Sequence, residues 1–334
     1  MINHKSDSRH FLKGSVQVIR IEKTLYQELM NCSEFLGRIG QIYQNGFYLI
    51  KEDGGLTYFQ ESKWLHSPFG AVLDRSIGKW VKDVSLREGD VFHRRGEFLL
   101  RKTSNECSIH LNPSKLVELK RTLCFSPPDR GTLLFWIQLI SKNIFKWGKF
   151  QGIAGTLTLL EEILSDITLP PSIPISLWSR HALPLVRKLI QCIPDKDLDV
   201  FNVAWESLLG LGPGLTPAGD DFLVGFVAAH KLFSSSFGKR LENYDLKKKL
   251  KEKAMVRTVP IAFQFLNHAL EGVFSETLYL IFGDLTSHDQ LKDHEDDLHL
   301  RKESTDQIED FLRWGHSSGT DTMTGIVFGL WTMI

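Results

Sequence analysis

The chain has 334 residues, of which 42% are hydrophobic and 11% aromatic, enough for sizeable cores and too apolar for a disordered chain. Its 40 basic and 40 acidic residues balance, so no net positive field favours a nucleic-acid partner. No apolar run reaches the roughly 18 residues of a membrane span, the polar start has no apolar leader, and four scattered cysteines form no CxxC pair. We therefore expect a cytoplasmic protein without nucleic-acid or membrane partners.

The first third of the chain is predicted to be rich in β structure. Residues 1–14 are expected to be a disordered N-terminus, and residues 15–125 a β-rich domain. Short apolar or alternating runs, such as 16–21 and 47–50, are separated by turn signals that contain glycine. The segment 91–101 has a glycine between two such runs and predicts a hairpin. Many short strands at this spacing favour a small sandwich or barrel.

The remainder, residues 131–334, is predicted to be an all-helical domain. Apolar residues recur at helical spacing in several segments, including 133–147, 181–192 and 260–270. The segment 287–306 is strongly polar and is expected to be an insertion. The predicted fold class is therefore α+β, with a β-rich domain followed by a helical one.

One glycine-rich segment is the strongest functional signal in the helical half. Residues 212–221 read GPGLTPAGDD and precede an apolar run that predicts a buried helix. Glycine permits backbone conformations with positive φ and close approach to a ligand. The start of the following helix carries free N–H groups and a partial positive charge, which suit an anion. The segment therefore predicts a ligand-binding loop.

The same pattern occurs a second time. Residues 219–225 read GDDFLVG and residues 319–325 read GTDTMTG, so both copies fit G-x-D-x-[LM]-x-G. Apolar helical residues follow each copy. A single aspartate in a first turn ordinarily complements its own helix, but the repetition favours a shared site. We therefore expect Asp221 and Asp321 to lie within roughly 10 Å of one another.

Two chemical schemes fit the paired motif. In the first, helix N-termini and nearby hydroxyl groups hold a phosphate, carboxylate or carbamoyl oxygen without any cofactor. The aspartates then orient the substrate, with Asp220, Asp221, Asp321 and His316 as the catalytic candidates. The predicted binding residues in this scheme are Gly212, Gly214, Thr216, Gly219, Ser317, Ser318, Gly319, Thr320 and Thr322. In the second, Asp220, Asp221 and Asp321 ligate Mg²⁺ or Mn²⁺, which prefer clustered oxygen donors.

The longer motif resembles the signature of a bacterial family. Residues 209–225, LGLGPGLTPAGDDFLVG, are similar to the AllH family, long listed as of unknown function, whose best-known member is a subunit of oxamate carbamoyltransferase in allantoin and purine catabolism. Residues 316–325, HSSGTDTMTG, resemble that family's second patch. The resemblance extends over residues 15–334, although Ala218 stands where the family often has serine. It implies a subunit of a hetero-complex that converts oxalurate and phosphate to oxamate and carbamoyl phosphate, with an anion held near Thr216.

Two alternative functions remain open from the sequence. Residues 319–322, GTDT, resemble the Asp-Thr-Asp-Thr metal motif of ADP-ribosylglycohydrolases, with Gly319 in place of one aspartate. That resemblance implies a Mg²⁺- or Mn²⁺-dependent hydrolase. The third hypothesis is a non-catalytic subunit that binds a ligand.

Overall fold

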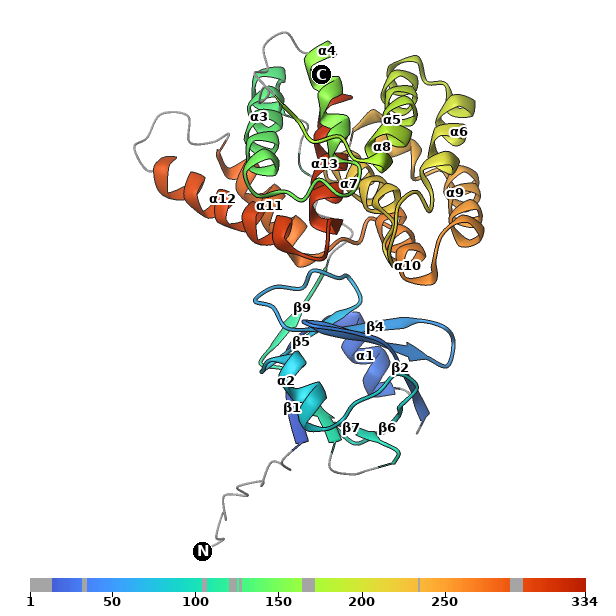
Figure 1. Ribbon diagram of the computed structural model, residues 1–334, viewed down its shortest axis with the longest axis vertical. Helices are drawn as coiled ribbons and strands as arrows, with labels where there is room; N and C mark the ends of the chain where they lie inside the picture. Colours follow the sequence, from blue (N-terminus) through green and yellow to red (C-terminus); the bar gives the residue numbers. More distant parts are fainter. Residues whose placement is uncertain are drawn as a thin grey trace, which may run out of the picture. The chain divides into compact units, whose positions relative to one another are not determined.

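The computed structural model describes residues 14–31, 35–103, 107–119, 125, 128–163, 172–233, 235–288 and 297–334. The chain divides into two compact units, residues 1–119 and 120–334. The first strand begins at Gly14, while the other residues of the predicted disordered N-terminus lie outside the described part. Strands occupy the first unit and helices dominate the second (Figure 1), so the predicted α+β class is confirmed.

In its described residues, the first unit contains one sheet and two short helices. The helices are α1, Lys23–Asn31, and α2, Ile77–Asp83. The strands are β1 (Gly14–Glu22), β2 (Phe35–Tyr43), β3 (Gly46–Lys51), β4 (Leu56–Gln60), β5 (Gly70–Leu73), β6 (Val91–Arg95), β7 (Phe98–Arg101), β8 (Cys107–His110) and β9 (Lys115–Val117). The predicted hairpin is confirmed as β6 and β7, which pair antiparallel around Gly96, a residue with φ of 61°.

The sheet closes on itself. Its strand order is β5-β4-β3-β2-β6-β7-β8-β1-β9, and β1 pairs in addition with β5. The strands from β5 to β1 therefore form a barrel, which is one of the two predicted architectures. Strand β1 pairs parallel with β8 through its first residues and parallel with β9 through its last. Closure removes the free edges that an open sheet would leave.

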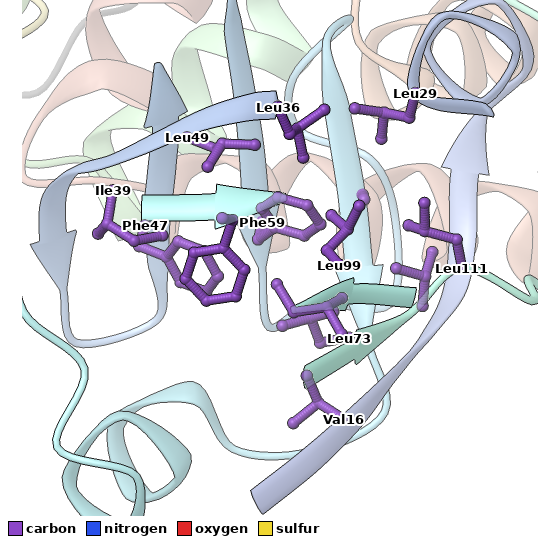
Figure 2. Close-up of a cluster of buried hydrophobic side chains, with 14 of the residues drawn as sticks. Val16, Leu29, Leu36, Ile39, Phe47, Leu49, Phe59, Leu73, Leu99 and Leu111 are labelled. Atoms are coloured by element: carbon purple, nitrogen blue, oxygen red, sulfur yellow. The ribbon is translucent and has the colours of Figure 1, made fainter. Parts of the chain in front are cut away.

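The barrel interior is filled with aliphatic and aromatic side chains. Phe47 and Phe59 stack with ring centroids 5.1 Å apart, and Trp80 of α2 stacks on Phe47 at 5.9 Å. Figure 2 shows Val16, Leu36, Leu73 and other side chains from different strands meeting in this interior, with Leu29 from α1. Successive strand residues point to opposite faces of a sheet. Alternate residues of the apolar runs predicted as strands therefore point into the barrel and form this core.

The second unit is helical. Its helices are α3 (Arg130–Trp147), the 3₁₀ turn η1 (Ala154–Thr158), α4 (Leu159–Ile163), α5 (Leu177–Asp195), α6 (Leu198–Leu208), α7 (Ala218–Leu232), α8 (Ser236–Arg240), α9 (Tyr244–Arg257), α10 (Pro260–Leu270), α11 (Glu276–His288), α12 (Asp297–Arg313) and α13 (Ser318–Trp331). No helix in the described ranges has the length and apolarity needed to cross a membrane.

The predicted polar insertion spans the connection between two of these helices. Helix α11 continues to His288, and α12 begins at Asp297. Residues 297–306 of the predicted insertion are therefore helical. The residues between the two helices lie outside the described part of the chain.

Helices α7 and α13 form the centre of the helical unit. Figure 1 shows them side by side, with α3 and α12 next to α13. Helices α6 and α10 contact α7. Every residue of α7 and residues 318–330 of α13 are buried. A helix that is apolar on all sides is typical of such a central position.

Candidate functional site

The two copies of the motif begin the two central helices, and glycine sets how closely these helices pack. A methyl group on Gly225 would overlap the carbonyl oxygen of Thr322. In the same way, a methyl group on Gly325 would overlap the carbonyl oxygen of Phe222. Phe222 and Thr322 occupy matching positions in the two copies, so the contact is reciprocal. Both last glycines of the motif are therefore explained by the close contact of α7 with α13.

The first glycine of each copy makes a second repeated contact. A side chain on Gly219 would overlap the carbonyl oxygen of Leu208, at the end of α6. A side chain on Gly319 would overlap the carbonyl oxygen of Phe311, near the end of α12. Each motif helix thus packs closely on the helix that precedes it. The repeat therefore includes two similar helix pairs, α6–α7 and α12–α13, in addition to the short sequence pattern.

The loop before α7 uses glycine for backbone conformation and caps the helix with its own carbonyl groups. Gly210, Gly212 and Gly214 have φ of 71°, 118° and 99°, which favour glycine. The N–H of Gly219 donates to the carbonyl of Leu211 at 2.8 Å, and the N–H of Asp220 donates to that of Pro217 at 2.9 Å. These two early N–H groups of α7 therefore already have partners, which weakens the predicted anion site at this helix end.

A hydroxyl pair joins the two motifs. Thr216 Oγ1 and Ser318 Oγ lie 2.8 Å apart, although the residues are separated by about one hundred positions in the chain. Thr216 is half-buried and Ser318 is buried. This hydrogen bond places the beginnings of α7 and α13 side by side, as a shared site requires.

Asp221 lies beside this hydroxyl pair. Its side chain belongs to a residue that is 5% exposed, and its Oδ2 has no hydrogen-bond partner among the described residues. Burial raises the pKa of Asp221 well above its usual value, and the nearby Asp321 and Asp220 raise the pKa further. Hydrogen bonds from Ser318 and Thr216 oppose this shift. The protonated form of this carboxyl group is therefore favoured over a wider pH range than in an exposed aspartate.

Asp321 is the matching residue of the second copy, and it is 0% exposed. Its Oδ1 accepts a hydrogen bond from the N–H of Ile153 at 2.8 Å, at the start of η1. Burial raises the pKa of Asp321 to about 7, against hydrogen bonds from Ile153, Ser317 and Ala154. A side chain on Gly152 would overlap this carboxyl group. Asp321 therefore caps η1 and fixes the backbone that precedes it.

Asp220 faces a different neighbour. It accepts hydrogen bonds from Thr258 Oγ1 at 2.6 Å and from the N–H of Gly210 at 3.2 and 3.3 Å. Burial raises the pKa of Asp220 to about 7, and these hydrogen bonds oppose the rise. Thr320 occupies the same position in the second copy and accepts from the N–H of Lys149 at 2.9 Å. Both residues therefore attach the motif to a flanking segment.

These contacts do not fit the predicted three-carboxylate metal site. Both oxygens of Asp220 and one oxygen of Asp321 already accept hydrogen bonds from the protein. Within the described ranges, no three His, Cys, Asp or Glu side chains are arranged to hold a metal ion. The residues present thus favour a site built from hydroxyl, amide and neutral carboxyl groups.

The segment after α3 contributes contacts that carry no motif in the sequence. Besides its backbone bond to Thr320, Lys149 donates from Nζ to the carbonyl groups of Gly315 at 2.6 Å and Arg313 at 3.2 Å. Desolvation lowers the pKa of Lys149. Residues 148–153 therefore hold the turn that precedes α13. The glycines at 148, 152 and 155 were the available sequence signal for a closely packed backbone.

The remaining predicted site residues, and the buried His230 of α7, take separate positions. His316 and Gly214 are exposed at the loop surface, and Ser317 is the N-cap residue of α13. Thr322 is buried at the α7–α13 contact. His230, at the other end of α7, bonds to Ser235 at 2.8 Å and to Thr332 at 3.1 Å. Burial lowers its pKa to about 3, so His230 is a neutral residue of the core.

Comparison with known proteins gives a match to the segment that holds both motifs. No solved structure matches the chain. The family resemblance predicted from the two motifs is confirmed over one continuous segment that contains both of them. Residues 208–330, from the end of α6 to the end of α13, match the family model of oxamate carbamoyltransferase subunit AllH.

Proposed function

We propose that this chain is a subunit of a carbamoyltransferase-type complex that acts on oxalurate or a related ureido acid with phosphate. One observation carries the proposal: the AllH model matches the segment that holds both motifs, and the Thr216–Ser318 bond joins those motifs into one place. A fold alone would not support a function. Here the family match and the contact between the motifs concern the same residues.

The chemistry of the joined motifs suits a small polar substrate. The hydroxyl groups of Thr216 and Ser318 both donate and accept hydrogen bonds, and the neutral carboxyl group of Asp221 does the same. Pro213, Gly214 and His316 are exposed in the loops before the two helices. A site near the surface of one subunit suits completion by other polypeptides of a complex, which can supply the groups that bind phosphate.

Turnover by the assembled complex tests the proposal. The chain is purified together with the products of its neighbouring genes, and carbamoyl phosphate is measured with oxalurate and phosphate as substrates. We expect phosphate-dependent turnover, reduced at least about tenfold by combining Thr216→Val with Ser318→Ala, since two hydrogen-bonding groups are lost. Ser207→Ala is the matched control, because Ser207 is exposed and its hydroxyl donates to the carbonyl of Val203 in its own helix. Absence of phosphate-dependent turnover contradicts the proposal.

The two alternatives give different results in the same experiment. A hydrolase dependent on Mg²⁺ or Mn²⁺ would lose activity with a chelator and need no phosphate. The bonds already accepted by Asp220 and Asp321 lend this alternative little support. A non-catalytic subunit would leave turnover unchanged when Thr216 and Ser318 are both replaced.

A further inference from the structure

Among the described residues, the three buried acids of the site have no cationic partners. Asp220 bonds to the hydroxyl of Thr258 and the N–H of Gly210, and Asp321 bonds to the N–H of Ile153. The hydrogen-bonding partners of Asp221 are hydroxyl groups. In this part of the structure the nearby Lys149 directs its ammonium group to backbone carbonyls instead. An anion placed beside Asp221 would meet acidic side chains without a compensating positive charge.

The ends of the two motif helices are also partly occupied. The carbonyl of Leu211 accepts from the N–H of Gly219, and the carbonyl of Trp314 accepts from that of Gly319 at 3.3 Å. The repeat thus closes each helix end with its own loop. Helix ends that bind phosphate leave such N–H groups open to the ligand. This arrangement disfavours a phosphate between the two helices.

Two buried carboxyl oxygens at the motifs have no partner among the described residues, Asp221 Oδ2 and Asp321 Oδ2. Asp221 Oδ2 is buried and has no partner in the described part of the chain, next to the hydroxyl pair of Thr216 and Ser318. A buried carboxyl oxygen without a partner is costly unless a ligand or water satisfies it. A primary carboxamide carries two N–H donors, one carbonyl acceptor and no charge, which complements a carboxyl group and two hydroxyl groups.

We infer that Thr216, Ser318 and Asp221 bind the uncharged carboxamide or ureido end of the substrate in preference to a phosphate or carboxylate group. This inference rests on the proposed function and deepens it, because it assigns one end of the substrate to this chain. The anionic groups of the reaction are then held outside this cluster. Asp221 acts here as a neutral hydrogen-bonding group.

Two ligands of the same skeleton separate these possibilities. Oxamate and oxalate differ in having NH₂ or O⁻ at one end, and inorganic phosphate is the third probe. Isothermal titration with the full chain measures the dissociation constant of each. We expect oxamate to bind at least about tenfold more tightly than oxalate or phosphate, since a carboxylate at that end loses donors and adds charge.

Variants of Asp221 test whether its carboxyl group acts as a neutral hydrogen-bonding group. Asp221→Asn keeps a donor and an acceptor, so we expect the oxamate dissociation constant to change by less than about threefold. Asp221→Ala removes both and should weaken binding at least about tenfold. Thr216→Val, at a half-buried position, gives the same direction if the alanine variant fails to fold. Melting temperature and far-ultraviolet circular dichroism check folding for each variant.

Three outcomes overturn the inference. They are oxalate or phosphate binding as tightly as oxamate, loss of oxamate binding in a folded Asp221→Asn protein, and no oxamate binding by either the chain or its complex. Turnover is measured separately, so the two proposals fail separately. An active complex whose subunit prefers oxalate contradicts this inference alone, whereas a selective subunit in an inactive complex contradicts only the proposed function.

Discussion

The two copies of the motif share their helix packing and differ in their loops. In both, a glycine contacts the backbone of the opposite helix, and a buried aspartate follows two residues after the first glycine. The first copy has a glycine-proline loop with three positive-φ glycines, whereas the second has a short turn held by Lys149. The residue after the first glycine, which bonds to a flanking segment, is Asp220 in one copy and Thr320 in the other. The two copies thus share the helix contact, while each loop has its own anchoring partner.

The largest expected effect concerns the shared contact. Gly225→Ala and Gly325→Ala each place a methyl group against a backbone carbonyl that cannot move alone. We expect each to lower the free energy of unfolding by about 3 kcal/mol, measured by urea denaturation followed by circular dichroism. The matched control is Gly283→Ala in α11, where a methyl group meets nothing within 4 Å. It should be neutral or stabilising by up to about 1 kcal/mol.

Equal effects at the two positions would support the repeat. If one glycine tolerated alanine while the other did not, the reciprocal contact of α7 and α13 would be contradicted. If Gly283→Ala lowered the free energy of unfolding as strongly, the effect would come from replacing any glycine in a helix and not from the contact between α7 and α13.

The second prediction uses Asp220, the acid that the second copy lacks. Its pKa is raised to about 7 in the fold, against about 4 in the unfolded chain. The folded state therefore holds a proton that the unfolded state has lost between these values. Stability from this group is complete below about pH 4, falls as pH rises towards 7, and is level above that. Asp321 acts in the same direction.

We expect the protein to unfold at lower urea concentration at pH 8 than at pH 6. Asp220→Asn should reduce this difference by about 1 kcal/mol, because one of the three buried acids with a raised pKa is removed. His230, whose pKa is lowered to about 3, acts in the opposite direction below its unfolded value of about 6.5, and this effect is the same with and without Asp220→Asn. An unchanged difference in Asp220→Asn would contradict the raised pKa of Asp220.

The smallest expected effect concerns the anchor of the second loop. Lys149→Met removes two hydrogen bonds to the turn before α13 and should cost about 1 kcal/mol of unfolding free energy. Lys146→Met is the matched control, since Lys146 lies over the ring of Trp147 and makes no bond to that turn in the described structure. Equal losses of unfolding free energy for the two substitutions would show that the hydrogen bonds from Lys149 to the turn do not stabilise the protein.

The sequence predicted those features that depend on local patterns. Alternating apolar runs and glycine turns indicated a β-rich first unit, and the spacing of apolar residues indicated the helices that follow. The pairing of the motifs could be inferred because the same residues recur with the same spacing. Their glycines indicate close backbone contacts, although the sequence does not name the backbone that each glycine contacts.

Other features depend on contacts between distant positions and left no local pattern. The glycines near residue 149 indicate close packing, but the local sequence there and at Thr258 does not indicate that the contacts are with Thr320 and Asp220. The carboxyl groups were predicted to act together, yet Asp220 and Asp321 face flanking backbone. Barrel closure has the same cause, because the pairing of β1 with β5, β8 and β9 joins remote residues.

The contact between α7 and α13 also affects the order in which the unit can assemble during synthesis. About one hundred residues separate the starts of the two helices, so α7 leaves the ribosome well before its main packing partner exists. At typical elongation rates, this leaves an apolar helix uncovered for about 5 to 20 seconds. During that interval α7 exposes the face that carries Gly225 and later packs against α13. Chaperones or another nascent copy can contact this face.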